Sequence, residues 1–231
     1  MVLSFLTIHI VWGSTYLAIR YSIETIPPLY TAGIRHLLAG TILLAWCLAR
    51  RLRPTWAQIR ASIIIGTFFF LIGHGSLHWA ELVVPSGVAA LLIATEPVWV
   101  AALSAISVDR LRLNASGIAG LIIGVAAVAI LIGKPATSVD MKLFIGSLVV
   151  VGSAISWTLG IIYSRTAPLH PIPIMSAAMS LLCGGVLLIA TSCVTGSAQT
   201  FHIANVSAVS ALAPPSGRFR AWKCLRARIH R

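Results

Sequence analysis

The sequence predicts an all-α polytopic membrane protein with about seven transmembrane helices. Hydrophobic residues make up 58% of the 231 positions, charged residues only 10%, and the mean hydropathy is +0.95. A soluble domain carries about 25% charged residues, so this composition excludes a soluble enzyme, a disordered tail and a nucleic-acid-binding module. Strands of a membrane barrel alternate polar and apolar residues over about ten positions, and no segment of the sequence shows that pattern.

Seven apolar segments, bounded by charges, prolines and polar breaks, define the expected helices. They are residues 3–22, 30–49, 61–80, 85–107, 115–133, 143–163 and 172–194. Each is close to the length of about 20 residues that a spanning helix requires. The first segment has neither a basic leader nor a small-residue cleavage site before a soluble domain, so we expect it to remain as a helix.

Basic residues concentrate in alternate loops, which predicts the orientation of the chain. One set of loops carries seven arginines: Arg50, Arg51, Arg53, Arg60, Arg110, Arg112 and Arg165. The other set carries only three basic residues: Arg20, Lys134 and Lys142. Cytoplasmic loops are enriched in Lys and Arg, so we expect a bacterial inner-membrane protein with a cytoplasmic N-terminus. The net charge of +12 then reflects orientation in the membrane, and no nucleic-acid partner is expected.

An internal repeat is present at an offset of about 145 residues, which is the spacing between Trp12 and Trp157. The matched positions are Trp12, Arg20, Pro28, Ala32 and Gly40 with Trp157, Arg165, Pro173, Ala177 and Gly185. Five helices separate the two copies, so the second copy runs through the membrane in the opposite direction, as in many secondary transporters. This reading divides the chain into a first repeat (1–135) and an incomplete second repeat (142–211). The alternative is a chance match between two apolar segments.

The last twenty residues, 212–231, do not follow the pattern of the other loops. Six basic residues in this tail would reverse the charge bias if the tail lay outside the cell. We expect a truncated or frame-shifted gene product in which the tail is not part of the fold. The alternative is an amphipathic, lipid-binding tail that uses Phe219, Trp222, Leu225 and Ile229.

Two motifs resemble the EamA-type permeases of the drug/metabolite transporter superfamily. The first runs from Trp12-Gly13-Ser14-Thr15-Tyr16 through Ala18-Ile19-Arg20 and Pro27-Pro28 to Gly33-Ile34-Arg35. The second is Pro85-Ser86-Gly87-Val88-Ala89-Ala90 followed by Glu96-Pro97-Val98-Trp99. The resemblance implies ten helices in two inverted five-helix repeats around a central cavity, and transport of small metabolites such as amino acids by alternating access. No cofactor is implied, and relative to that ten-helix fold we expect this chain to lack helices 8–10.

Charged residues within apolar segments are costly, by about 2.5–3.5 kcal/mol at mid-depth, and are therefore candidates for function. Glu96 lies about eleven residues into the fourth segment, and Pro97 removes a backbone donor beside it. We expect Glu96 to couple protons or contact substrate, the alternative being a structural hydrogen bond. Arg35 either contacts an anionic group or Glu96, or extends its side chain to the outer headgroups.

Histidine and aromatic side chains complete the expected substrate site. His74, His78 and Glu81 fall on one helical face, and His74 and His78 have a metal-ligand spacing. Cavity lining is preferred over metal binding, because no second histidine pair supplies further ligands. His9, His36, His170 and His202 are expected to be solitary. Trp12, Tyr16, Trp99 and Trp157 are expected to form an aromatic wall.

Two other functional classes remain open alongside the secondary carrier. One is a non-transporting membrane subunit that packs onto a partner, and the other is a metal-ion carrier that uses His74 and His78. Gly120 and Gly124 form a small-xxx-small pair, which predicts close packing within the bundle or a homodimer. A retinal pigment is excluded because no lysine occurs between Lys142 and Lys223, and membrane proteases are excluded because their nucleophile or paired aspartates are missing.

Overall fold

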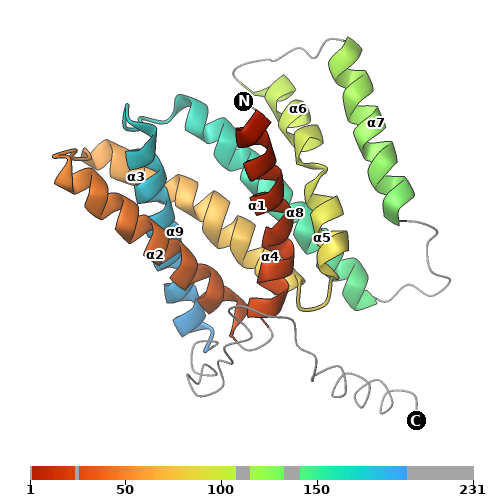
Figure 1. Cartoon of the computed structure of the whole chain (residues 1–231), viewed down its shortest axis with the longest axis horizontal. Coiled ribbons are helices and arrows are strands. Elements are labelled where there is room, and N and C mark those ends of the chain that lie inside the picture. Colours follow the sequence, from red (N-terminus) through yellow and green to blue (C-terminus); the bar gives the residue numbers. More distant parts are fainter. Residues whose placement is uncertain (1, 24–25, 108–114, 133–140, 197–231) are drawn as a thin grey trace.

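The computed structural model describes residues 2–23, 26–107, 115–132 and 141–196, and every regular element in these ranges is helical. The elements are α1 (Val2–Ser22), α2 (Pro28–Ala49), α3 (Trp56–Gly66), the π-helix η1 (Thr67–His74), α4 (Gly75–Ala80), α5 (Ser86–Ile93), α6 (Glu96–Ile106), α7 (Ala115–Ile132), α8 (Met141–Thr166) and α9 (Pro173–Val194). Because α3, η1 and α4 are continuous and α5 and α6 follow one another, these elements occupy the seven predicted segments (Figure 1). The all-helical fold class is confirmed.

Five helical rods in the described ranges are long and apolar enough to cross a membrane. They are Pro28–Ala49, Trp56–Ala80, Ser86–Ile106, Met141–Thr166 and Pro173–Val194. α1 and α7 are also helical where the sequence predicts spans, with 21 and 18 residues respectively. The structure therefore shows a polytopic membrane protein. Residues 212–231, for which the sequence predicts a tail outside the fold, lie outside the described residues.

Local sequence signals explain where several helices begin. Thr55 caps α3: its side-chain oxygen accepts the backbone N–H of Gln58, whose side chain in turn accepts the backbone N–H of Thr55. This reciprocal pair satisfies donors that a helix start leaves without partners. α2 and α9 both begin with a proline, Pro28 and Pro173, at a position where the missing N–H costs no hydrogen bond.

The π-helix η1 is held against α8 by three side chains that donate to its backbone carbonyls. Ser153 Oγ donates to the Gly73 carbonyl (2.9 Å), Ser156 Oγ to the Phe68 carbonyl (2.7 Å) and Trp157 Nε1 to the Phe69 carbonyl (2.9 Å). Without water in the bilayer core, each backbone group must find a partner within the protein. α8 therefore supplies donors to the irregular segment, and π-helical segments are common at functional sites.

Trp157→Phe should destabilise the protein because it leaves the Phe69 carbonyl without this donor while retaining an aromatic ring. The carbonyls of a π-helix also accept backbone N–H groups five residues along the chain, so the change removes one additional hydrogen bond, worth about 0.5–1.5 kcal/mol. Unfolding by denaturing detergent should show a loss in this range. Trp56→Phe, at an exposed position, should have almost no effect, and equal losses for the two variants would contradict the role of the hydrogen bond.

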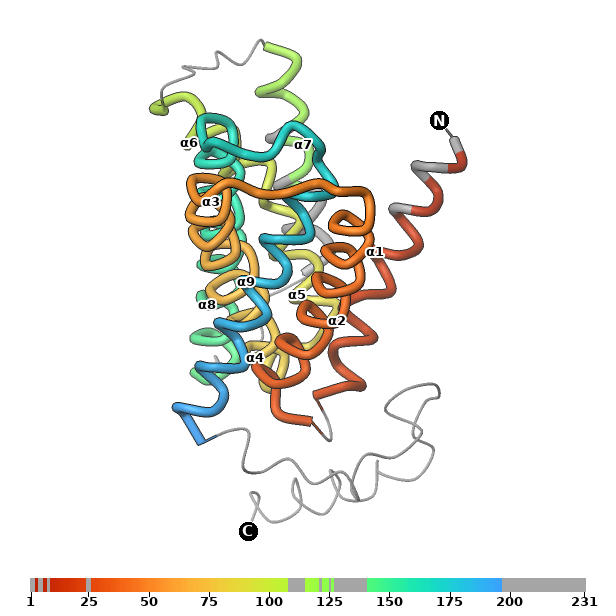
Figure 2. The backbone as a smooth tube through the Cα atoms, turned by 90° about the vertical axis from the view of Figure 1, so that its left-hand side faces the viewer, coloured from red at the N-terminus to blue at the C-terminus, as the bar shows by residue number. Residues whose placement is uncertain are grey.

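α2 and α9 form the most extensive helix contact of the fold and lie side by side in both views (Figures 1 and 2). A Cβ atom built on Gly40 would lie 2.6 Å from the backbone nitrogen of Leu182, and one on Gly185 would lie 2.7 Å from that of Leu37. These two contacts are reciprocal, because Gly40 and Leu37 correspond to Gly185 and Leu182 at the repeat offset. Such exchange of partners is typical of a two-fold axis.

α7 lies at the edge of the bundle, where α5 is its main neighbour (Figure 1). Added Cβ atoms on Gly120 and Gly124 would meet nothing within 4 Å in the described part of the chain. The pair therefore does not serve packing among the described helices, and a homodimer through Gly120 and Gly124 stays a prediction. By contrast, Gly33, Gly40, Gly66 and Gly73 all lie against neighbouring helices.

Candidate substrate cavity

A cavity of about 750 Å³ opens between α1, α5, α6, α7 and α8. Its lining residues are Trp12, Tyr16, Ala90, Ile93, Ala94, Glu96, Pro97, Val100, Ala101, Ser104, Gly117 and Arg165. The volume lies within the range of about 300–1,000 Å³ that small-molecule sites occupy. Three predicted site residues, Trp12, Tyr16 and Glu96, line this cavity.

A break between α5 and α6 places Glu96 in the cavity wall. α5 ends at Ile93 and α6 begins at Glu96, and Ala94 and Thr95 form a turn between them. Pro97 has no N–H, so the carbonyl four residues earlier loses its usual helical donor. Discontinuous helices of this kind form substrate sites in many transporters, and the local opening expected from Pro97 is present.

Arg165 lies at the far end of the same cavity, in the last turn of α8. Ser104 and Gly117 line the cavity near the end of α6 and the start of α7, so the cavity extends from mid-bundle to the end where α1 begins. Sequence reasoning did not select Arg165 as a site residue. The internal repeat carried a signal for Arg165, because Arg165 matches Arg20. A basic residue that recurs at matched positions of both copies is a candidate site residue in each copy.

A second, much smaller cavity of about 20 Å³ lies deeper in the bundle. It is lined by Trp12, Tyr16, His74, Leu77, Ile93, Glu96, Ser153, Ala154 and Trp157. Trp157 stacks on Phe69, with ring centroids 4.8 Å apart, and meets Trp12 edge-on at 5.8 Å. The two repeat-related tryptophans are therefore in direct contact and form an aromatic wall, as the sequence predicts for Trp12 and Trp157.

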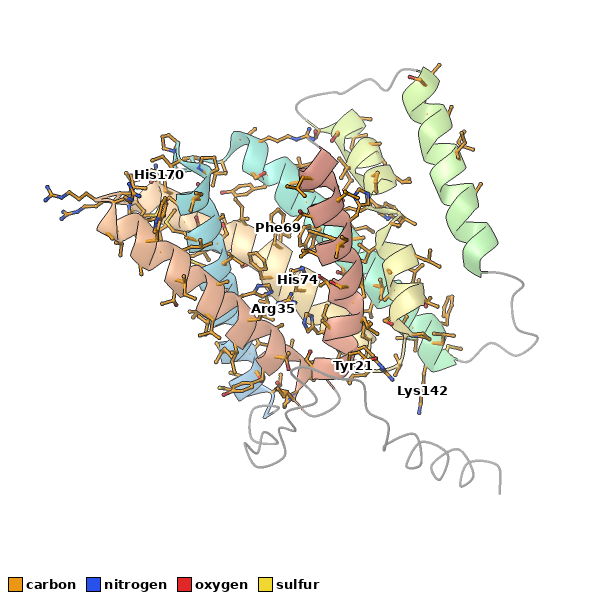
Figure 3. All side chains as sticks on the ribbon, viewed as in Figure 1. Tyr21, Arg35, Phe69, His74, Lys142 and His170 are labelled. Carbon is orange, nitrogen blue, oxygen red and sulfur yellow. The ribbon has the colours of Figure 1, made fainter. Side chains whose placement is uncertain are left out.

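The expectation that His36 is solitary is wrong. His36 Nε2 lies 2.8 Å from His74 Nδ1, and the two rings are stacked with centroids 4.9 Å apart. His36 is buried in α2, and its partner ends η1 at the centre of the bundle, where Figure 3 labels His74 beside Arg35. One histidine sits on each of two helices, 38 residues apart, so no local spacing in the sequence could reveal the pair.

Three predicted site residues lie outside both cavities. His78 is buried, and its Nδ1 donates to the backbone carbonyl of His74 (2.7 Å). Trp99 Nε1 donates to Thr95 Oγ1 (3.2 Å). Arg35 is exposed on α2 and has no ion pair with Glu96 in the described residues.

The metal-carrier alternative gains no support from this geometry. Among the described residues, no group of three or more His, Cys, Asp or Glu side chains could hold a metal ion. Nδ1 of His74 is hydrogen-bonded to Nε2 of His36. Nδ1 of His78 donates to the backbone carbonyl of His74.

Glu81 follows the Trp56–Ala80 span and lies at the opposite end of the bundle from Arg165. Its side chain is fully buried, and neither carboxylate oxygen has a hydrogen-bond partner in the described residues. Arg20 donates from its guanidinium to the Glu81 backbone carbonyl. Burial raises the pKa of Glu81 to about 8, against the opposing effect of the Arg20 charge.

Comparison with known proteins identifies the family. The model of the EamA-like transporter family matches residues 1–133, which is more than half of the chain. The chain belongs to this family.

Several curated relatives of this EamA-like chain are named as transporters. It is 34% identical over 197 residues to the uncharacterized inner membrane transporter YedA of Escherichia coli K12, which covers 84% of this chain and 62% of the relative. It is 27% identical over 195 residues to the uncharacterized transporter YoaV of Bacillus subtilis, covering 83% and 66% of the two chains. Protein PagO of Salmonella typhimurium is 32% identical over 139 residues, covering 59% and 45%.

The chain spans about 62% of the length of YedA, so the relatives carry sequence beyond the part that matches. No solved structure is significantly similar to the chain. The several apolar spans and the similarity to an inner membrane transporter show that this EamA-like protein is a multi-pass inner-membrane protein.

Proposed function

We propose that the chain forms the cavity of a secondary transporter for small zwitterionic metabolites such as amino acids. The observation that carries this proposal is the presence of Glu96 and Arg165 on one 750 Å³ cavity with Trp12 and Tyr16 in its wall. A carboxylate suits the ammonium group of such a solute, and a guanidinium suits its carboxylate. The aromatic rings supply apolar contact for a side chain.

The expected mechanism is alternating access by two inverted repeats. Two observations support it: the broken helix α5–α6 at the cavity, and the reciprocal glycine contacts of α2 and α9. Transporters with inverted repeats rock one repeat against the other around a central site. The division into repeats 1–135 and 142–211 is part of this proposal.

The distribution of charge favours a cytoplasmic location for the mouth of the cavity, which is the end lined by Arg165. In the described part of the chain, Arg50, Arg51, Arg53, Arg60 and Arg165 lie at the end where α1 begins, and Arg20 and Lys142 lie at the other end. Figure 3 shows the two ends, with His170 at the first and Lys142 at the second. Because cytoplasmic ends are rich in basic residues, the N-terminus and the mouth are assigned to the cytoplasm.

Binding to three related ligands tests the proposed substrate class. The full chain, purified in lipid nanodiscs, is titrated with leucine, with 3-methylbutylamine and with 4-methylpentanoate, and affinity is measured by calorimetry. Leucine should bind most tightly because only it offers both charged groups. A hydrogen bond to a charged group is worth about 1.5–3 kcal/mol, so each missing group should weaken binding by about tenfold or more.

Substitutions of Glu96 and Arg165 test which charged group of the ligand each side chain binds. In Glu96→Gln, leucine should no longer bind more tightly than 4-methylpentanoate. In Arg165→Gln, leucine should no longer bind more tightly than 3-methylbutylamine. Glu81→Gln and Arg60→Gln make the same chemical changes outside the cavity and should leave binding unchanged. Equal affinity for all three ligands, or equal losses in the control variants, would refute the assignment of the substrate class.

A further inference from the structure

The His36–His74 contact links the tautomers of two buried imidazoles. A neutral imidazole has one N–H donor and one acceptor nitrogen. Since His36 Nε2 and His74 Nδ1 are 2.8 Å apart, one of these nitrogens must carry the hydrogen and the other must accept it. A change of tautomer in one ring therefore requires a change in the other.

The small cavity provides room for a water molecule between His74 and Glu96. His74 and Glu96 both line the cavity, together with Tyr16 and Ser153. Its volume of about 20 Å³ has room for one water molecule, which needs about 10–15 Å³ and two to four polar partners. His74 uses Nδ1 for His36, so Nε2 is the nitrogen that can bond to such a water.

Titratable and charged side chains from four parts of the bundle surround His74. α2 contributes Arg35 and His36, the continuous rod that contains His74 contributes His78, α1 contributes Tyr16, and α6 contributes Glu96. Burial and the guanidinium of Arg35 both disfavour an imidazolium ion. A proton can still pass through the pair if each ring gains one proton as it releases another.

We propose that His36, His74 and Glu96 form a proton-transfer chain in which Glu96 is the terminal acceptor. A proton from solvent adds to His36 Nδ1, and the His36 Nε2–H bond breaks as a bond to His74 Nδ1 forms. The His74 Nε2–H bond then breaks as its proton passes to the bridging water, which releases a proton to the Glu96 carboxylate. One proton is taken up, and both imidazoles end neutral in the opposite tautomer.

In this proton-transfer chain, the tautomers of both histidines depend on the charge of Glu96. With Glu96 ionised, the water donates to the carboxylate and accepts from His74 Nε2–H, and His36 Nε2–H donates to His74 Nδ1. With Glu96 protonated, every one of these hydrogen bonds reverses. His78 is a built-in reference, because its Nδ1 must remain a donor to the His74 carbonyl.

Nitrogen NMR of the histidine rings tests this prediction without a transport assay. The full chain, labelled with ¹⁵N-histidine, is placed in lipid nanodiscs and titrated from pH 5 to pH 9. His36 and His74 should exchange their protonated and unprotonated nitrogens completely and at one common midpoint, while His78 keeps Nδ1 protonated. Glu96→Gln should abolish the exchange, and Glu81→Gln, which changes an acid outside the small cavity, should retain it.

Each result decides for or against the proposal. Fixed tautomers of His36 and His74 in the wild-type protein, separate midpoints, or an exchange that persists in Glu96→Gln would overturn it. If Glu96→Gln does not fold, the wild-type titration alone decides. The inference rests on the proposed function only in assigning the coupled ion of transport to the proton, and ligand binding and tautomer exchange can fail independently of each other.

Discussion

Gly40→Val should cause one of the largest losses of stability in this protein, about 3 kcal/mol, because α2 and α9 are in backbone contact at this position. A Cβ atom there would lie 2.6 Å from the Leu182 nitrogen and 2.9 Å from its Cα, and neither backbone atom can move without displacing α9. Overpacking of a well-packed site costs about 1–3 kcal/mol, and the branched side chain of valine is at the upper end. Unfolding in denaturing detergent measures the change.

Gly185 and Gly120 provide the controls for this prediction. Gly185→Val meets the backbone of Leu37 in the reciprocal contact and should cost a similar amount. A single movement of α9 away from α2 relieves both clashes. The double variant should therefore lose clearly less stability than the sum of the two single losses. Gly120→Val, where an added Cβ meets nothing within 4 Å, should be nearly neutral. Additive losses, or an equal loss at Gly120, would contradict the reciprocal contact.

Glu81→Gln should remove a large pH dependence of stability. Burial raises the pKa of Glu81 from 4.5 to about 8, so the folded protein binds a proton that the unfolded chain releases between these values. The stabilisation is fully present below about pH 4.5 and is lost as the pH rises through about 8. Each unit of pKa difference corresponds to about 1.4 kcal/mol, so the wild-type protein should lose a few kcal/mol across this window.

The difference between two stability curves isolates the contribution of Glu81. Free energies of unfolding are measured from pH 4 to pH 9 for the wild-type protein and for Glu81→Gln. The curves should lie close together at pH 4, and the wild-type protein should become the less stable of the two as the pH rises. Lys142→Gln, which removes a charge at the same end of the bundle, should keep the wild-type slope. A Glu81→Gln curve parallel to the wild-type curve would contradict a buried, protonated carboxyl.

The helices were predictable because each depends on information that is local in the chain. A spanning helix requires a run of about 20 apolar residues, and the breaks at Pro28, Pro85 and Pro173 mark helix starts in the sequence and in the structure. Glu96 was selected for a related reason, since an acid within an apolar segment is costly; the structure places it in the cavity wall, and its function stays a prediction.

The contacts that local sequence signals do not reveal depend on which helices meet. His36 carries no local signal that its partner is His74, and Arg165 carries none that it shares a cavity with Glu96. His78 and Trp99 bond to the His74 carbonyl and to Thr95, and their role at a substrate site stays a prediction. The π-helical geometry of η1 is likewise set by three donors on α8 that lie 80 or more residues away.

The membrane location, the positions of the helices and the family motifs can all be read from the amino-acid sequence, because lipid imposes length and hydropathy on each segment separately. Which polar side chains meet depends on the packing of the helices. Helix pairing brings together residues far apart in the chain, and within a dry bundle a polar atom must bond to whichever partner that pairing provides.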